Sequence, residues 1–182
     1  MATRSTPSAY VVLLRGINVG GHGKVAMPAL RDVCVDIGCA DVTTYIQSGN
    51  VVLSSQQSAA RLETTLAKAI ADRLGVSPDV MVRSGQELAA VIENNPYPQA
   101  AEGTLHVGFL ANPSDNDTRN AVADVECEPE QFTIRDREIY FYLPNGMGRS
   151  KLAPLLVRKV KSPVTARNWR TVLKLHAMAN TL

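Results

Sequence analysis

Hydrophobic and polar positions follow two periods in the first half of the chain. A short apolar run at Tyr10–Leu14 is typical of a buried strand. Apolar residues then recur at helical spacing from Met27 to Ile37 and from Leu62 to Leu74. Further strands are expected at residues 42–46, 51–53 and 80–82. The order is therefore βαββαβ, which is the ferredoxin-like order.

Local signals support these boundaries. Pro28 suits the first turn of the first helix, and Gly38 suits its end. Ser58 is a suitable N-cap for the second helix, and Gly75 a suitable stop. The segment Gln47–Asn50 has the composition of a hairpin turn, with Gly49 or Asn50 supplying a positive φ.

The second half repeats part of this order. Ser84 and Glu87 form a capping-box pattern before a short helix, and Thr104–Leu110 follows as a strand. A helix at 114–123, a hairpin of strands at 131–134 and 138–143, and helices at 150–159 and 165–179 complete the chain. We therefore predict an α+β fold with a ferredoxin-like lobe at 10–83. A related β-α-β-β-α lobe with basic C-terminal helices is predicted at 84–182, the two forming one compact unit.

Charge is distributed unevenly along the chain. The 182 residues carry a net charge of +2. Residues 85–144 hold three Lys or Arg and eleven Asp or Glu, whereas residues 145–182 hold eight Lys or Arg and no acid. The basic tail could pack against the acidic middle, or it could face an anionic ligand or nucleic acid.

Two loops and one helix start concentrate candidate ligand-binding residues. The glycine-rich segment Arg15–Lys24 joins a strand to a helix, where backbone N–H groups can bind an anion. It lacks the Walker A pattern, and its Gly21–Ala26 match to a dinucleotide fingerprint is out of place. An ordinary wide loop is the alternative. The candidate donors in this loop are Arg15, Asn18 and Lys24.

The other candidates lie in the basic tail. The segment Asn145–Lys151 leads into a helix, which makes Lys151 a candidate. We expect Thr165 to cap the last helix, so that Arg167, Asn168 and Arg170 lie in its first turns, near an anion. A solvated basic helix face is the alternative interpretation.

Other chemistries find little support. The three histidines and three cysteines have no metal-ligand spacing, so no metal site is expected, and the cysteines are expected to be reduced thiols. No nucleophile motif or carboxylate pair stands out, and catalytic residues and cofactors are unassigned. The longest apolar run has five residues, which is too short for a membrane span. We expect a soluble cytoplasmic protein with no membrane partner.

Four motifs resemble a known family. They are Val12–Gly21, Tyr45–Val51, Leu143–Met147 with Ser150–Lys151, and Thr165 with Arg167–Lys174. Their sequences and order are similar to those of domain-of-unknown-function family 1697. The resemblance implies a two-lobed α+β fold with ferredoxin-like halves, and it implies no assigned activity.

Three functions stay open on these residues. The first is a protein that binds an anionic ligand, nucleotide-like or nucleic acid, through the basic cluster. The second is an enzyme acting on a phosphorylated or carboxylated small molecule. The third is a scaffold without a small-molecule ligand. If the cations line a concave pocket, a small-molecule ligand is favoured. If they spread over a convex face, nucleic acid is favoured. If they pair with the acids of residues 85–144, a scaffold is favoured.

Overall fold

The computed structural model describes residues 6–20 and 23–182, which divide into two compact units. Unit 1 comprises the described residues up to Ala90 together with Lys174–Leu182, and unit 2 comprises Val91–Leu173. The chain therefore leaves unit 1, forms unit 2 and returns to unit 1. The division into lobes at 10–83 and 84–182 that form one compact unit stays a prediction.

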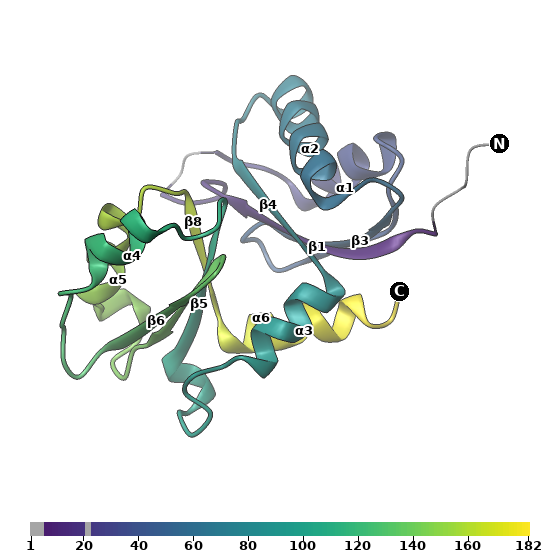
Figure 1. Ribbon diagram of the computed structural model, residues 1–182. Helices are drawn as coiled ribbons and strands as arrows, with labels where there is room; N and C mark the ends of the chain where they lie inside the picture. Colours follow the sequence, from purple (N-terminus) through teal and green to yellow (C-terminus); the bar gives the residue numbers. More distant parts are fainter. Residues whose placement is uncertain (1–5, 21–22) are drawn as a thin grey trace. The chain divides into compact units, whose positions relative to one another are not determined.

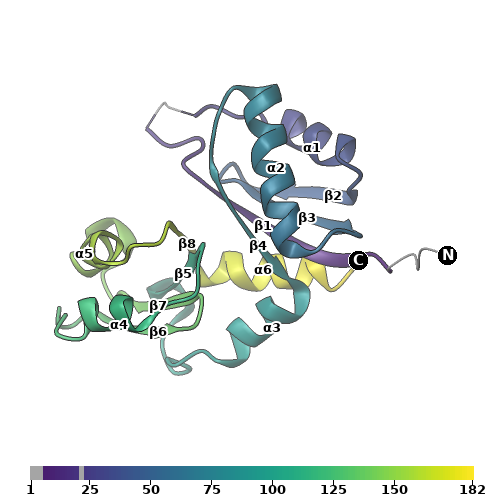
Figure 2. The same ribbon diagram turned by 45° about the horizontal axis from the view of Figure 1, so that its top comes forward.

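Unit 1 has the βαββαβ order that the sequence predicts (Figure 1). Its elements are β1 (Ser8–Arg15), α1 (Met27–Asp36), β2 (Ala40–Tyr45), β3 (Asn50–Ser55), α2 (Ala59–Leu74) and β4 (Asp79–Ser84). The four strands form an antiparallel sheet in the order β2-β3-β1-β4. Figure 2 shows α1 and α2 lying over one face of this sheet.

Both helices of unit 1 begin and end where the local chemistry requires. Pro28 lies in the first turn of α1, and Ser58 accepts a hydrogen bond from Arg61 N at the start of α2. After α1, Gly38 adopts a φ of +88°, and Cys39 N donates to Cys34 O at 3.1 Å. This is a Schellman motif, which ends the helix and brings residues 34 and 39 together.

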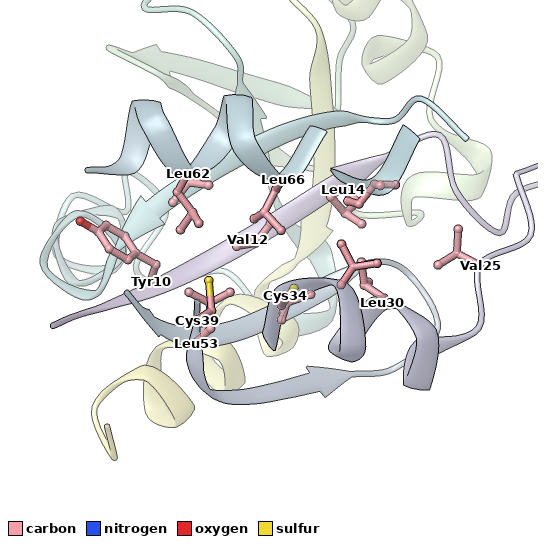
Figure 3. Packing of buried hydrophobic residues seen from close by; sticks show 14 of the residues in the cluster. Tyr10, Val12, Leu14, Val25, Leu30, Cys34, Cys39, Leu53, Leu62 and Leu66 are labelled. Atoms are coloured by element: carbon pink, nitrogen blue, oxygen red, sulfur yellow. The ribbon is translucent and has the colours of Figure 1, made fainter. Parts of the chain in front are cut away.

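The core of unit 1 lies between the sheet and its two helices. Tyr10, Val12 and Leu14 alternate along β1 and point to this side, where they meet Leu62 and Leu66 of α2 (Figure 3). Both leucines are fully buried, and burying a leucine side chain contributes about 1.5–3 kcal/mol. This packing fixes the positions of the loops at the ends of the strands.

Unit 2 contains a second sheet with the same topology. Helix α3 (Gly85–Glu93) begins in unit 1 and ends in unit 2. The predicted capping box is formed at its start, because Glu87 N donates to Ser84 Oγ and Ser84 N donates to Glu87 Oε2. The following elements are η1 (Glu102–Thr104), β5 (Leu105–Leu110), α4 (Asn116–Val122), β6 (Gln131–Arg135), β7 (Glu138–Tyr142), η2 (Met147–Arg149), α5 (Leu152–Lys159) and β8 (Val164–Asn168). Helix α6 (Trp169–Ala179) begins in unit 2 and belongs to unit 1 from Lys174 onward. The strand order is β6-β7-β5-β8, and helices α4 and α5 lie over one face of the sheet (Figure 2).

One predicted element is wrong. The helix expected from Thr165 to Ala179 is two elements, since residues 164–168 form β8 and the helix begins at Trp169. Strand β8 pairs antiparallel with β5, with Arg167 opposite Val107. This strand completes a second βαββαβ order, so the second half matches the first more closely than the sequence predicted. The α+β fold with ferredoxin-like halves is confirmed.

Candidate functional site

Two loops of unit 1 are joined at the end of its sheet. We call residues 16–20, 23–26 and 46–49 the Asn18 loop cluster. The Asn18 side chain donates from Nδ2 to Val25 O and to Gln47 O, each at 3.0 Å, and Val25 N donates to Asn18 Oδ1 at 2.9 Å. One side chain therefore closes the glycine-rich loop and attaches it to the β2–β3 turn.

Asn18 was predicted to be a ligand donor, and the structure shows what its side chain already does. Both amide hydrogens of Nδ2 donate to backbone carbonyls, and Oδ1 accepts from the backbone. Its φ of +54° lies in the left-handed region, which asparagine tolerates better than most residues. The side chain of Asn18 therefore positions the loops, while Val19, Lys24 and Ile46 of the cluster are exposed.

Glycine is required at position 49 of the turn. Its φ is +75°, and an added Cβ would lie 2.8 Å from Leu14 Cβ and 2.9 Å from Ile17 Cδ1. Leu14 N also donates to Gly49 O at 2.8 Å. The turn is therefore packed directly against β1 and the start of the glycine-rich loop, so the two loops hold a fixed relation.

Two exposed apolar side chains of the cluster were missed by the sequence analysis. Val19 follows Asn18 and is 69% exposed, and Ile46 precedes Gln47 and is 52% exposed. Ile46 also has a φ of +50°, an outlier for a β-branched residue, and such strain is typical of functional sites. The sequence offered no sign of this strain, because Gly49 or Asn50, three or four residues later, was the expected positive-φ position.

The two cations predicted in this region lie at the surface. Arg15, at the end of β1, forms a 2.7 Å ion pair with Asp79 in which both side chains are more than 40% exposed. Lys24 is exposed on the loop just before α1. Gly21 and His22, part of the dinucleotide pattern, lie outside the described residues. Arg15, Asn18 and Lys24 thus share one region of unit 1, with Lys24 and the ion-paired Arg15 exposed.

In unit 2, the N-terminus of α5 holds an internal anion. The buried Glu130 carboxylate accepts through Oε2 from Leu152 N at 2.8 Å and from Lys151 N and Ser150 Oγ at 3.2 Å. Ser150 Oγ in turn accepts from Ala153 N at 2.9 Å. The anion expected at this helix start is thus a side chain of the protein, and the Lys151 side chain faces solvent.

Arg167 and Asn168 occupy positions that differ from the prediction. The expectation that Arg167 lies in a helical turn is wrong, because it lies in β8 and is only 8% exposed. Its guanidinium donates to Thr165 Oγ1 at 2.7 Å and to Ala166 O at 2.9 Å, and burial lowers its pKa to about 10. Asn168, instead of Thr165, caps α6, since Thr171 N donates to its Oδ1 at 2.8 Å.

Within unit 2, part of the basic tail meets the acidic middle. Arg170 forms a 3.6 Å exposed ion pair with Glu102. Lys161 contributes to a lowered pKa of the exposed Asp115 carboxylate, although hydrogen bonds from Thr118 are the main cause. Part of the charge asymmetry is therefore compensated inside the protein, as the scaffold hypothesis expects.

The predicted site residues thus belong to both units. Arg15, Asn18 and Lys24 lie in unit 1, and the remaining four, Lys151, Arg167, Asn168 and Arg170, lie in unit 2. A single binding site formed by all seven stays a prediction.

Metal and membrane chemistry find no support in the part of the chain that the structure describes. No group of three or more His, Cys, Asp or Glu side chains there could hold a metal ion. Burial lowers the pKa of His106 on β5, because desolvation disfavours the charged imidazole. No helix among the described residues has the length and apolar character needed to cross a membrane.

The two sheets with a shared strand order define a protein of two ferredoxin-like halves, and comparison with known proteins identifies its family. Residues 8–140 match the model of a family described as a protein of unknown function, DUF1697, and the chain belongs to that family. A solved structure, the conserved bacterial protein SP0830 from Streptococcus pneumoniae, is similar with a TM-score of 0.80 and 28% identity. The alignment covers 96% of this chain and 99% of that one. A search of curated proteins finds no match.

Proposed function

We propose that the protein binds single-stranded nucleic acid through the Asn18 loop cluster and its flanking cations. The observation that carries the proposal is that exposed Val19, Ile46 and Lys24 lie on loops joined by Asn18, with the exposed Arg15 at the end of the strand that leads into them. Apolar side chains can pack against bases and sugars, while cations bind the phosphates. Side chains of both kinds lie on, or next to, the two loops that Asn18 joins.

A polymer suits these loops better than a mononucleotide. Small-molecule sites are usually concave and enclose most of their ligand, whereas Val19 is 69% exposed and Ile46 is 52% exposed. A nucleic acid strand makes many weak contacts along an exposed surface and needs no enclosing pocket. The exposure of the cluster therefore favours nucleic acid over a nucleotide-like ligand.

Arg15 can take part without a large cost. Its ion pair with Asp79 is exposed on both sides, and such pairs contribute about 0–1 kcal/mol. A phosphate can replace the carboxylate and accept two hydrogen bonds from the guanidinium. Arg167 of unit 2 is buried, and its hydrogen bonds to Thr165 and Ala166 suit a role in the sheet.

The experiment is a fluorescence-anisotropy titration with labelled 15-nucleotide oligo(dT) and oligo(U) at two salt concentrations. We expect Lys24→Gln to weaken binding about threefold to tenfold and to reduce the salt dependence by about one released ion. Val19→Ser and Ile46→Ser should weaken binding with an unchanged salt dependence. Lys68→Gln, which removes an exposed cation from α2 of the same unit, is the matched control and should have little effect.

Two results would reject the proposal. One is the absence of saturable binding to either oligonucleotide at low salt. The other is equal weakening by Lys24→Gln and Lys68→Gln, which would indicate attraction by net charge alone. Full displacement of the oligonucleotide by ATP would instead favour a nucleotide-like ligand. That result would overturn the preference for a polymer.

A further inference from the structure

Unit 2 carries two pockets that share lining residues around Tyr97. One has a volume of about 350 Å³ and the other about 470 Å³, and both are lined by Tyr97 and Gln131. We call the two together the Tyr97 groove. It shares no residue with the Asn18 loop cluster, because every residue that lines it belongs to unit 2.

Two contacts hold the side chain of Tyr97, and a third holds its backbone. Its hydroxyl forms a 3.1 Å hydrogen bond with Thr133 Oγ1 of β6, and its ring centroid lies 6.0 Å from that of Tyr142 on β7. Its backbone N–H donates to Asn95 Oδ1 at 2.9 Å. A half-buried aromatic ring fixed in this way is a preorganised contact surface, which reduces the entropy lost on binding.

The two sides of the groove differ in chemistry. The smaller pocket is lined by prolines 96 and 98 and by Tyr142, with the exposed amide of Gln99 at its margin, and has no charged residue. The larger pocket is lined by the exposed carboxylates of Glu126 and Glu128. Neither pocket has a lysine or arginine among its lining residues.

We propose that the Tyr97 groove binds an extended, cationic, proline-containing peptide segment of a protein partner. Rigid tyrosine rings beside prolines are the kind of surface on which polyproline II helices pack. The amides of Gln99 and Gln131 can donate to the carbonyl groups of such a peptide, which its own backbone leaves free. Glu126 and Glu128 supply the charge complement for an arginine or lysine next to the proline segment.

Charge complementarity is the observation that selects this partner. Residues 85–144 hold eleven acids against three cations, and the two exposed glutamates bring part of this charge to the groove. Glu130, which also lines the larger pocket, is already bonded to the N-terminus of α5 and does not contribute to the selection.

The test is a titration of the full chain with three fluorescein-labelled decapeptides. The first combines prolines with two arginines, the second replaces the arginines by glutamates, and the third keeps the arginines in a glycine–serine sequence. We expect only the first to bind saturably. The double variant Glu126→Gln/Glu128→Gln should weaken it about threefold to tenfold, the range that two exposed ion pairs provide.

Two further variants complete the experiment. Gln99→Ala, an exposed position, should weaken the first peptide without changing its salt dependence, and Glu93→Gln, an exposed acid on α3, should leave it unchanged. Equal binding of the first and third peptides, or an equal effect of Glu93→Gln and the double variant, would overturn the proposal. Lys24→Gln separates the two proposals, because it should weaken oligonucleotide binding and leave peptide binding intact.

Discussion

Replacing Asn18 by alanine is the most direct test of how the loop cluster is held. The variant loses three side-chain hydrogen bonds, two to Val25 and one to Gln47. At about 1 kcal/mol net for each bond, the loss is about 3 kcal/mol. Water can reach the exposed Gln47 carbonyl and recover part of it, whereas alanine at a φ of +54° adds about 1 kcal/mol. We expect the free energy of unfolding to fall by about 2–4 kcal/mol.

Two substitutions at the same position separate the contributions. Asn18→Gly loses the same bonds but adopts the left-handed conformation easily, so it should be less destabilised than Asn18→Ala by about 0.5–1 kcal/mol. Asn18→Asp keeps an acceptor for Val25 N but places charge beside two carbonyl oxygens, and should be at least as unstable as the alanine variant. Urea unfolding followed by circular dichroism measures all three.

The control is Asn120→Ala, at an exposed position of α4, which should change stability by less than about 0.5 kcal/mol. A loss at Asn18→Ala as small as that of the control would refute the assignment of Asn18 as the residue that joins the loops. A loss at Asn18→Gly equal to or larger than that of Asn18→Ala would refute the part ascribed to the left-handed backbone.

Three further predictions concern the interior of each unit. Glu130→Ala removes the hydrogen-bond acceptor at the start of α5 and should lower the free energy of unfolding, measured in urea, by about 2–4 kcal/mol. Glu130→Gln should lower it less. Added sulfate should restore part of the stability of the alanine variant only. Gly49→Ala should cost about 2–4 kcal/mol, since its methyl group would overlap two core side chains and its φ is positive; a neutral result would show that the turn can move away from β1. Burial, with a smaller contribution from Cys39, raises the pKa of the Cys34 thiol from 9.0 to about 12, so the folded state holds a proton that the unfolded state releases between these values. Stability should therefore fall between pH 9 and pH 12, and this fall should be smaller in Cys34→Ala but unchanged in Cys127→Ala.

The sequence predicts unit 1 well because its signals are local. Caps and stops such as Ser58 and Gly75 lie next to the helices that they bound, and the apolar period separates helix from strand. The same reasoning misplaced β8. Residues 165–168 continue the helical spacing of α6 without a break, and the partner that makes them a strand is β5, more than 50 residues earlier. Long-range pairing decided the structure there over local pattern.

The candidate site stays a prediction, and the structure shows contacts around it that the sequence did not reveal. Arg15 and Lys24 lie on or beside the expected loop, but the bonding of Asn18 to Gln47 joins residues 29 positions apart, which no local pattern reveals. Likewise, the acceptor at the start of α5 is Glu130, about 20 residues upstream. A helix N-terminus in a sequence indicates that an anion fits there, and only the fold shows whether the protein supplies it.

The return of the chain to unit 1 has a consequence for synthesis. Residues 174–182 are translated after all of unit 2, although they belong with the residues that precede it. Unit 2 therefore has its whole sequence outside the ribosome before unit 1 can take up its final segment, which reverses the usual order in which the N-terminal part completes first. Until then the early part of unit 1 waits without that segment, and a pause in translation near residue 173 would prolong this stage.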